Sequence, residues 1–469
     1  MDIQAMEAQL EKLFAEKKLP GAAVCALGPE GQIYARGFGH RDAAGELPVD
    51  ENTIFGVASM SKSMTALALC LLECEGRVSL DDPVAKYLPK FRVPGIPQSM
   101  ITIHHLCMHT ASIPPMEPLE WSIAMNSRER DGEWVCAMRE SAPNDMATID
   151  QVMDYIAHCD YRTLGMPGEY MSYSNEGYAV LCYVFDAASG ERLEDYVRDH
   201  IYAPLGMTRT VMDDDCSGAR AIAGGNITSL FEREADGRLT CDDHWSVLPP
   251  FRGCAMVKST ARDMAAYYRC IANGGVHEGR QALPRRAIER LVGAEFPLLE
   301  RPVYCLGLNK RRFGRAVICE HGGALHGIST YGSLLMGQGW GFAALSNLGD
   351  AETCEMGWAM MNAVLGIAPE TSHNWSHPVD YAFDAPEMLA GEYVGHEGEP
   401  VRLKVRAVEG GIAVEKDGKP LRAAYCGGSL FSCHEGDDES VFARAEFLLR
   451  DGRAWGVRWG TRIFERVEA

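Results

Sequence analysis

Strand-forming segments lie at both ends of the first 370 residues, and helix-forming segments fill the middle. Near the start, two strand-like runs, GAAVCALGP and GQIYARGFGH, meet at a Pro-Glu-Gly turn. Strands return after residue 300 in VYCLGLNKRRFG, TYGSLLMG and WGFAALSNLG. A chain with this order can pair its strands by bringing its two ends together, which predicts an α+β fold. We expect one antiparallel sheet flanked by helices, with a helical subdomain between its halves.

The run TALALCLL, residues 65–72, is apolar on nearly every face and predicts a buried helix. Ser59 and Lys62 precede it three residues apart, so on a helix they share one face. The pair is either an ordinary helix start with a surface lysine or a nucleophile beside its activator. Because a Ser-x-x-Lys is expected about once or twice by chance in a chain this long, this motif alone favours the first interpretation.

Two later motifs change that balance. Tyr-Ser-Asn at residues 173–175 precedes a predicted helix, and His-Gly-Gly at residues 321–323 opens a predicted strand. With the Ser-x-x-Lys they follow the order of S-x-x-K, S-D-N and K-T-G in β-lactamases and penicillin-binding proteins. The chain resembles the class C β-lactamase-like serine hydrolases, which include D-aminopeptidases, D-alanyl-D-alanine carboxypeptidases and carboxylic esterases. The resemblance covers about residues 8–365 and implies a β-lactamase/transpeptidase-like fold.

The resemblance implies catalytic roles for Ser59, Lys62 and Tyr173. Ser59 would attack the substrate, and a serine hydroxyl needs a neighbour that takes its proton. Tyr173 would be that base, because a phenol that ionises at about pH 10 in water is favoured as phenolate by adjacent cations. Lys62, and also His321, could be those cations. Asn175 would project to the same side as Tyr173, donate to Ser59 or Lys62 and hold a substrate carbonyl.

The resemblance also implies how a substrate binds. The backbone N–H groups of Ser59 and Ala324 would form the oxyanion hole, and Gly322 and Gly323 would let a substrate backbone approach the strand closely. His321 stands where class C β-lactamases carry the lysine of Lys-Thr-Gly. Because histidine is mostly neutral at pH 7 and the threonine hydroxyl is missing, strong β-lactamase activity is not expected.

The implied function is cleavage of an amide (peptide) bond through an acyl-enzyme on Ser59. The substrate would be a small molecule or short peptide, and a D-amino-acid-containing peptide is the first choice by analogy with the group. A broad-range carboxylic esterase or a weak β-lactamase is an alternative. A further alternative, of a different class, is a binding or sensor protein that is acylated and does not turn over.

A cluster of metal-binding residue types lies in TIHHLCMHT, with His104, His105, Cys107 and His109. Its spacing fits no zinc pattern with a plausible fourth ligand, and similar sequences in the resembled group are structural. We therefore expect no metal and no cofactor in the mechanism.

The last part of the chain changes in texture. Residues 1–370 form the predicted hydrolase domain, residues 371–386 read as a linker, and residues 387–469 show short alternating runs with Gly-Gly and Asp-Gly turns. They predict a small antiparallel β-barrel that resembles a lipocalin-like domain. We expect it to fold largely apart and to contribute no residue to the chemistry. Two roles are open for this barrel. It could serve to stabilise the hydrolase domain and nothing more, or a loop such as YCGGSLFSCHEGDD, residues 425–438, could reach over the cleft and limit substrate size.

Composition limits which partners the protein can bind and indicates its cellular compartment. The formal net charge of −20 argues against nucleic acid and anionic membranes as partners. No run of 18 apolar residues occurs, and the first residues lack the basic and apolar regions of a signal peptide. With 16 scattered cysteines and no Cys-x-x-Cys pair, we expect a reducing, cytoplasmic location. The chain could also assemble with copies of itself.

Overall fold

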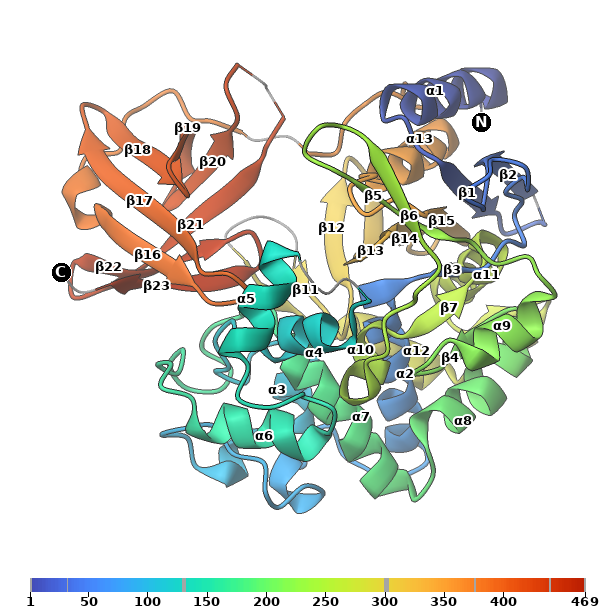
Figure 1. Cartoon of the computed structure of the whole chain (residues 1–469), viewed down its shortest axis with the longest axis horizontal. Helices are drawn as coiled ribbons and strands as arrows, with labels where there is room; N and C mark the ends of the chain where they lie inside the picture. Colours follow the sequence, from blue (N-terminus) through green and yellow to red (C-terminus); the bar gives the residue numbers. More distant parts are fainter. Residues whose placement is uncertain are drawn as a thin grey trace.

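The computed structural model describes residues 2–31, 33–128, 132–298, 303–374, 377–437 and 440–467. An α+β domain comes first, and a closed β-barrel begins at Gly391 and packs against one side of it (Figure 1). Within these described ranges, no helix is long and apolar enough to cross a membrane.

The main sheet confirms that the two ends of the first domain meet. Its eight strands pair antiparallel in the order β10-β11-β12-β13-β14-β15-β1-β2, so the early strand β1 lies directly beside the late strand β15. The sheet strands are β1 (Gly21–Leu27), β2 (Ile33–Gly39), β10 (Phe296–Pro297), β11 (Val303–Tyr304), β12 (Asn309–Phe313), β13 (Ala316–Leu325), β14 (Ile328–Leu335) and β15 (Trp340–Ser346). Short pairs elsewhere are formed by β3 (Phe55–Gly56), β4 (Val211–Met212), β5 (Leu230–Arg233), β6 (Leu239–Asp242), β7 (Val257–Ser259), β8 (Val276–His277) and β9 (Arg280–Gln281).

Helices cover both faces of this sheet. Every residue of β1 is buried, because alternate side chains enter two separate cores. One core holds Met6 and Leu10 of α1 with Met360 of α13, and the other holds α11 and the interior of α2. The α-helices are α1 (Ile3–Glu16), α2 (Ser61–Cys74), α3 (Ile103–Cys107), α4 (Pro118–Asn126), α5 (Glu133–Ser141), α6 (Ile149–His158), α7 (Asn175–Ser189), α8 (Leu193–Val197), α9 (Ser217–Ala223), α10 (Arg252–Ala255), α11 (Ala261–Ala272), α12 (Arg285–Gly293) and α13 (Cys354–Leu365). Single turns are η1 (Ala58–Met60), η2 (Val84–Lys86), η3 (Gln98–Met100), η4 (Arg198–Tyr202), η5 (Ala203–Leu205), η6 (Pro249–Phe251) and η7 (Pro386–Met388).

Helix α2 is buried as its sequence predicts. All residues from Ser61 to Leu72 are buried, because α2 lies between the sheet side of the domain and the helices α7, α10 and α12. A helix in this position holds its first turn rigidly, and η1 immediately precedes it.

The C-terminal part is the predicted antiparallel barrel. Each strand pairs with the next in sequence, and β16 closes the barrel by pairing with β23. Outward and inward residues alternate along β17, where Leu403 and Val405 enter the core. The strands are β16 (Gly391–Gly395), β17 (Val401–Val408), β18 (Gly411–Lys416), β19 (Lys419–Gly427), β20 (Leu430–His434), β21 (Ala443–Arg450), β22 (Arg453–Trp459) and β23 (Arg462–Val467).

The barrel packs against the first domain through an apolar contact, and its expected ability to fold largely apart stays a prediction. Leu448 and Ile463 of the barrel form one apolar cluster with Leu164, and the rings of Tyr170 and Trp455 meet at its edge. Alternating strands with polar outer faces resemble a self-contained barrel, and the sequence pattern does not mark which outward residues meet another domain.

Candidate active site

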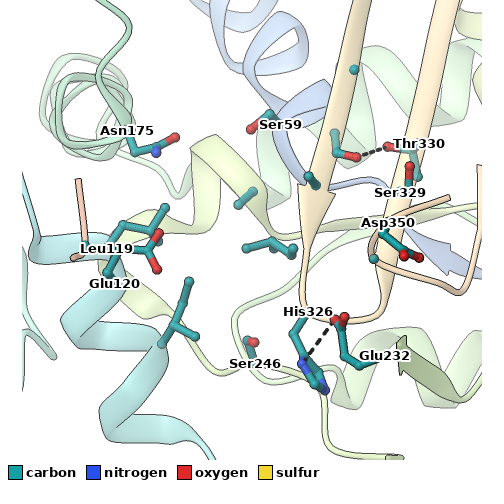
Figure 2. A pocket seen from close by; sticks show the side chains of 18 of the residues that line it. Ser59, Leu119, Glu120, Asn175, Glu232, Ser246, His326, Ser329, Thr330 and Asp350 are labelled. Atoms are coloured by element: carbon teal, nitrogen blue, oxygen red, sulfur yellow. Dashed lines mark hydrogen bonds and ion pairs between the residues drawn. The ribbon is translucent and has the colours of Figure 1, made fainter. Parts of the chain in front are cut away.

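Ser59 lies on a strained turn that faces a cavity. Ala58 has a φ of +46°, in the left-handed region that costs energy for a residue with a side chain. The Oγ of Ser61 donates to the carbonyl of Ala58 at 2.6 Å, and the Oγ1 of Thr330 donates to that of Val57 at 3.1 Å. These two hydrogen bonds hold the turn in place, and Ser59 lines a cavity of about 1380 Å³ (Figure 2).

The two glycines of the His-Gly-Gly motif have different roles. A Cβ on Gly323 would lie 2.3 Å from the carbonyl oxygen of Val57 and 3.2 Å from the Cβ of Ala58. Gly323 therefore lets strand β13 pack against the Ser59 turn; it also lines the cavity, and its predicted role in substrate approach stays a prediction. Gly322 is exposed and lines the cavity, and a Cβ there would meet only a carbonyl oxygen at 3.6 Å. Ala324 follows on the same strand and also lines the cavity.

Lys62 is fully buried beneath the cavity. Its Nζ donates to the Oγ of Ser59 at 3.1 Å, to the Oδ1 of Asn175 at 2.9 Å and to the carbonyl of Cys254 at 3.2 Å. An ammonium has three N–H donors, and these three acceptors use all of them. Lys62 thus holds the Ser59 oxygen in place as a donor, and the serine proton must pass to another group.

Tyr173 lines the cavity with Ser59 and has two cations against its ring. The Nζ of Lys62 and the guanidinium carbon of Arg462 each lie 4.8 Å from the ring centroid. The ring of His109 lies 4.3 Å away, centroid to centroid. Cations over an aromatic ring are attracted by the negative charge of its face. Two cations thus contact the ring of Tyr173, and its role as the base stays a prediction.

Two buried histidines behind Tyr173 are joined through one tyrosine. The backbone N–H of Ser174 donates to the Nδ1 of His109 at 3.1 Å, so the proton of this imidazole is on Nε2, which lies 3.0 Å from the hydroxyl of Tyr304. That hydroxyl lies 3.5 Å from the Nε2 of His321, whose Nδ1 meets the carbonyl of Gly322. With both imidazoles neutral, the chain of donors and acceptors is complete: His109 donates to Tyr304, Tyr304 to His321, and His321 to the carbonyl of Gly322.

His321 is therefore not the second cation that the sequence suggests. Burial, with a smaller contribution from the charge of Lys62, lowers the pKa of His321 to about 4. Burial and the same lysine place the pKa of His109 well below its usual range. The second cation comes from Arg462 of the barrel instead.

The lowered pKa of His321 predicts how stability depends on pH. The unfolded chain takes up this proton at about pH 6.5 and the folded chain only at about pH 4. The free energy of unfolding therefore loses the contribution of His321 as pH falls through this window. Between pH 7 and pH 4.5, the melting temperature of the His321→Gln variant should fall less than that of the wild type. Replacing the exposed His158 by glutamine should leave the fall in melting temperature over this pH range unchanged. Equal slopes for His321→Gln and wild type would contradict the assignment.

Asn175 connects the lysine to the barrel. It is the first residue of α7, whose N-cap Ser174 accepts from the N–H of Gly177 at 3.1 Å. The Oδ1 of Asn175 accepts from Lys62, and its Nδ2 donates to the Oε1 of Glu397 at 3.0 Å. The side chain is thus fixed at both ends before any substrate binds.

Carboxylates dominate the charge around the cavity. They come from several loops and strands of both domains, and Figure 2 shows Glu120 on one side and Glu232 and Asp350 on the other. Arg462 is the single lysine or arginine among the lining residues that the structure describes, and it is paired with Glu397. The lining carboxylates are Glu120, Glu232, Glu234, Asp242, Asp350, Glu352, Glu397 and Glu399.

The histidine cluster near residue 105 has structural roles. His105 accepts from the backbone N–H of Thr102 and completes a capping box at the start of α3. Cys107 is buried, and His109 faces Tyr304 as described above. Across the described part of the chain, no group of three or more histidine, cysteine or acidic side chains is arranged to hold a metal ion.

The structure brings the sequence-predicted residues to one place. Ser59, Tyr173, Asn175 and the segment 321–324 line the same cavity, and Lys62 lies directly beneath it. Their catalytic and binding roles stay predictions. The sequence did not predict that His109, Tyr304, Glu120 and residues of the barrel would lie at this site. Only His109 had a signal, its place in a dense histidine segment, and that segment was interpreted as structural.

Comparison with known proteins gives a consistent result. A family model described as Beta-lactamase matches residues 4–364, more than half of the chain. Penicillin-binding protein 4* of Bacillus subtilis is 28% identical over 205 residues, which is 44% of this chain and 40% of that protein. Esterase EstB of Burkholderia gladioli is 35% identical over 120 residues, 24% of this chain and 30% of that protein. The matches thus span less than half the length of these relatives.

Solved structures share the fold over a longer range. SurE superposes with a TM-score of 0.70 at 22% identity and covers 99% of both chains. The octameric penicillin-binding protein homologue from Pyrococcus abyssi has a TM-score of 0.68 at 22% identity, covering 99% of this chain and 100% of its own. D-amino acid amidase from Ochrobactrum anthropi SV3 has a TM-score of 0.59 at 22% identity over 74% and 92% of the two chains. At this level of identity the likeness establishes the fold alone.

Proposed function

The chain belongs to the beta-lactamase family of serine hydrolases, and on that basis we propose that it cleaves an amide bond of a small, positively charged substrate through an acyl-enzyme on Ser59. The observation that carries the proposal is the state of Lys62. Its three N–H donors are all used, one of them by Ser59, and we propose Tyr173, which lines the same cavity, as the acceptor of the serine proton.

The reaction follows from this geometry. The Ser59 oxygen attacks the carbonyl carbon while Tyr173 takes its proton, and the backbone N–H groups of Ser59 and Ala324 receive the negative oxygen. As the C–N bond breaks, Tyr173 returns the proton to the departing amine. Tyr173 then removes a proton from water, which attacks the acyl-enzyme, and the proton goes back to Ser59 when the acid leaves.

An amide is the proposed substrate class, and an ester is the second candidate. A D-amino acid amidase has the same fold, which supports a D-amino-acid-containing amide or short peptide. A curated esterase is 35% identical over 120 residues, which supports the ester. Antibiotic hydrolysis has less support, because the neutral His321 offers no cation for the carboxylate of a β-lactam. A protein that only binds has less support than an enzyme, because Ser59, Lys62 and Tyr173 are all in place.

A hydrolysis screen tests this function. We expect turnover of D- or L-aminoacyl amides and short-chain esters, and little of a chromogenic cephalosporin. Absence of turnover on all three classes, with a stable adduct on Ser59, would instead identify the binding or sensor protein. We also propose that the chain forms an oligomer, since an octameric homologue has this fold. Light scattering of the purified protein measures its oligomeric state.

The carboxylates around the cavity predict a preference for cationic substrates. Asp350, Glu352 and Glu397 are already paired with Arg233, Lys17 and Arg462, so the other lining carboxylates carry the effect. A charge of +1 about 8 Å from a single carboxylate gains roughly 2 kcal/mol at an effective dielectric constant near 20, or more than tenfold in binding. An aminoacyl amide with a free α-amine should therefore have a kcat/KM at least about tenfold above its N-succinyl counterpart at low salt. The ratio should shrink as sodium chloride is added. An unchanged or inverted ratio would remove charge from the proposal and leave the acyl-enzyme mechanism standing.

A further inference from the structure

The barrel places two charged side chains against the catalytic groups. Glu397 lies in the loop between β16 and β17, and Arg462 is the first residue of β23. We propose that Glu397 and Arg462 are positioning residues of the hydrolase site, Glu397 acting through Asn175 and Arg462 through Tyr173. The inference rests on the proposed function, and it assigns to the barrel a part in the reaction beyond stability.

Glu397 fixes which way the amide of Asn175 points. A side-chain amide has one oxygen acceptor and one nitrogen donor group. Lys62 requires the oxygen, and the carboxylate of Glu397 requires the nitrogen at 3.0 Å. A flipped amide would face a donor with its donor and a carboxylate with its oxygen, so it is excluded. Because the orientation of Asn175 is set from both sides, the third bond of Lys62, to Ser59, keeps its direction as well.

Arg462 is held so that its charge reaches Tyr173. Its guanidinium donates to the Oε1 of Glu397 at 2.6 Å, and its Nε forms an ion-pair contact with the other carboxylate oxygen. From this position its central carbon lies 4.8 Å from the ring centroid of Tyr173. Burial lowers the pKa of Arg462, while Tyr173, Glu176 and Glu120 favour its charged form. A guanidinium remains charged across the pH range of any assay.

The backbone of the same turn also holds the tyrosine. The N–H of Tyr173 donates to the carbonyl of Thr461 at 2.8 Å. Beside this bond, the N–H of Ile463 donates to the Oγ of Ser172 at 3.1 Å. Arg458 of β22 reaches the carbonyl of Met171, also at 3.1 Å. The segment that carries the base is thus bound to the barrel through main chain and side chain, in addition to its bonds with His109 of the first domain.

Every group that faces Tyr173 bears on the pH dependence of the reaction. Lys62 and Arg462 are the two cations, and burial with the charge of Lys62 favours the neutral forms of His109 and His321. Tyr304, which lies between the two imidazoles, is buried with a raised pKa. Loss of the Arg462 charge leaves Lys62 as the remaining cation at the ring. The acid limb of the rate profile should then move to higher pH.

The test combines conservative and disruptive variants at both positions. Arg462→Met and Glu397→Ala should each lower kcat on a short-chain ester by about tenfold to 10²-fold, because small displacements of catalytic groups cost this much. Arg462→Lys and Glu397→Gln should recover part of the loss, since each keeps a charge or an acceptor in place. The control is Arg406→Met, which breaks an ion pair with Glu415 on the outer face of the barrel and should leave kcat unchanged.

A mutant cycle identifies the route of the effect. If Glu397 acts through Asn175 and by holding Arg462, then Glu397→Ala should cost little more in a protein that already carries Asn175→Ala and Arg462→Met. Additive losses would overturn the assignment of Glu397. A loss in Arg462→Met that Arg462→Lys does not relieve, with an unchanged pH profile, would reduce Arg462 to a structural tether and overturn its assignment.

A second readout separates this inference from the proposed function. The rate at which a fluorophosphonate labels Ser59 needs only an activated nucleophile, and it should fall in Arg462→Met and Glu397→Ala. If wild type is not labelled, the proposed function fails. If wild type and variants are labelled equally fast, the positioning roles fail and the function stands. Melting temperatures check folding, and the nearly isosteric Glu397→Gln, expected to label more slowly than wild type, keeps the test valid if Arg462→Met does not fold.

Discussion

Replacing Ser59 with alanine is expected to abolish turnover, with kcat falling by roughly 10⁴- to 10⁶-fold, as for other serine nucleophiles. The substitution removes the one atom that forms the acyl-enzyme and leaves the turn intact, because the turn is held by Ser61 and Thr330 through the carbonyls of Ala58 and Val57. The melting temperature should therefore stay close to that of wild type. Steady-state hydrolysis and fluorophosphonate labelling, read by intact-mass spectrometry, measure the two effects.

Ser246 provides a matched control for Ser59. It lines the same cavity (Figure 2) but has no lysine beside it among the described residues. Ser246→Ala should keep both labelling and turnover. Full hydrolysis by Ser59→Ala, or labelling that persists in it and disappears in Ser246→Ala, would show that the nucleophile is a different residue.

Replacing Tyr173 with phenylalanine is expected to lower kcat by about 10²- to 10⁴-fold, the usual loss when a general base is removed. The ring and its contacts with Lys62, His109 and Arg462 are kept, so the change removes only the oxygen that would carry the proton. Rates should be compared on an amide and an ester with matched acyl groups. The amide should lose more, because its amine must be protonated as it leaves.

Tyr170→Phe is the control for this change, since Tyr170 stands on the same segment but packs against Trp455 and does not line the cavity. It should react at the wild-type rate. Wild-type activity in Tyr173→Phe would transfer the role of base to Lys62. Lys62→Ala should be at least as harmful as Tyr173→Phe in either case, because it removes the donor to Ser59 and Asn175 together.

Local geometry explains why much of the site could be predicted from sequence. Three residues along a helix bring Ser59 and Lys62 onto one face, and this holds in any fold that keeps the helix. The Tyr-Ser-Asn motif places Tyr173 and Asn175 at a capped helix start, which is also a local feature. The order of the three motifs along the chain predicted the fold by resemblance. In the structure, the sheet that joins β1 to β15 brings the three motifs together.

The rest of the site depends on contacts that no local pattern encodes. Arg462 follows a Gly-Thr turn like many others in the barrel, and Glu397 stands in a Gly-rich loop. One of the two alternatives for the barrel has a loop such as segment 425–438 reaching over the cleft. The described part of this segment instead contains β19 and β20, which form a hairpin of the barrel, and none of it lines the cavity. His321 could be a second cation by its sequence position, and the burial that lowers its pKa to about 4 is not visible in the sequence.

The backbone bond from Tyr173 to Thr461 joins two segments that leave the ribosome at very different times. Ser59 and its helix are translated long before the barrel, and domains generally fold in the order in which they emerge. A nascent chain can therefore complete the fold around its nucleophile while the tyrosine still lacks both its main-chain partner and the charge of Arg462. On the proposed roles, such a chain would be a slow catalyst until the β22–β23 turn docks. The order of the two domains along the messenger RNA would then delay full hydrolytic activity until the barrel has been made.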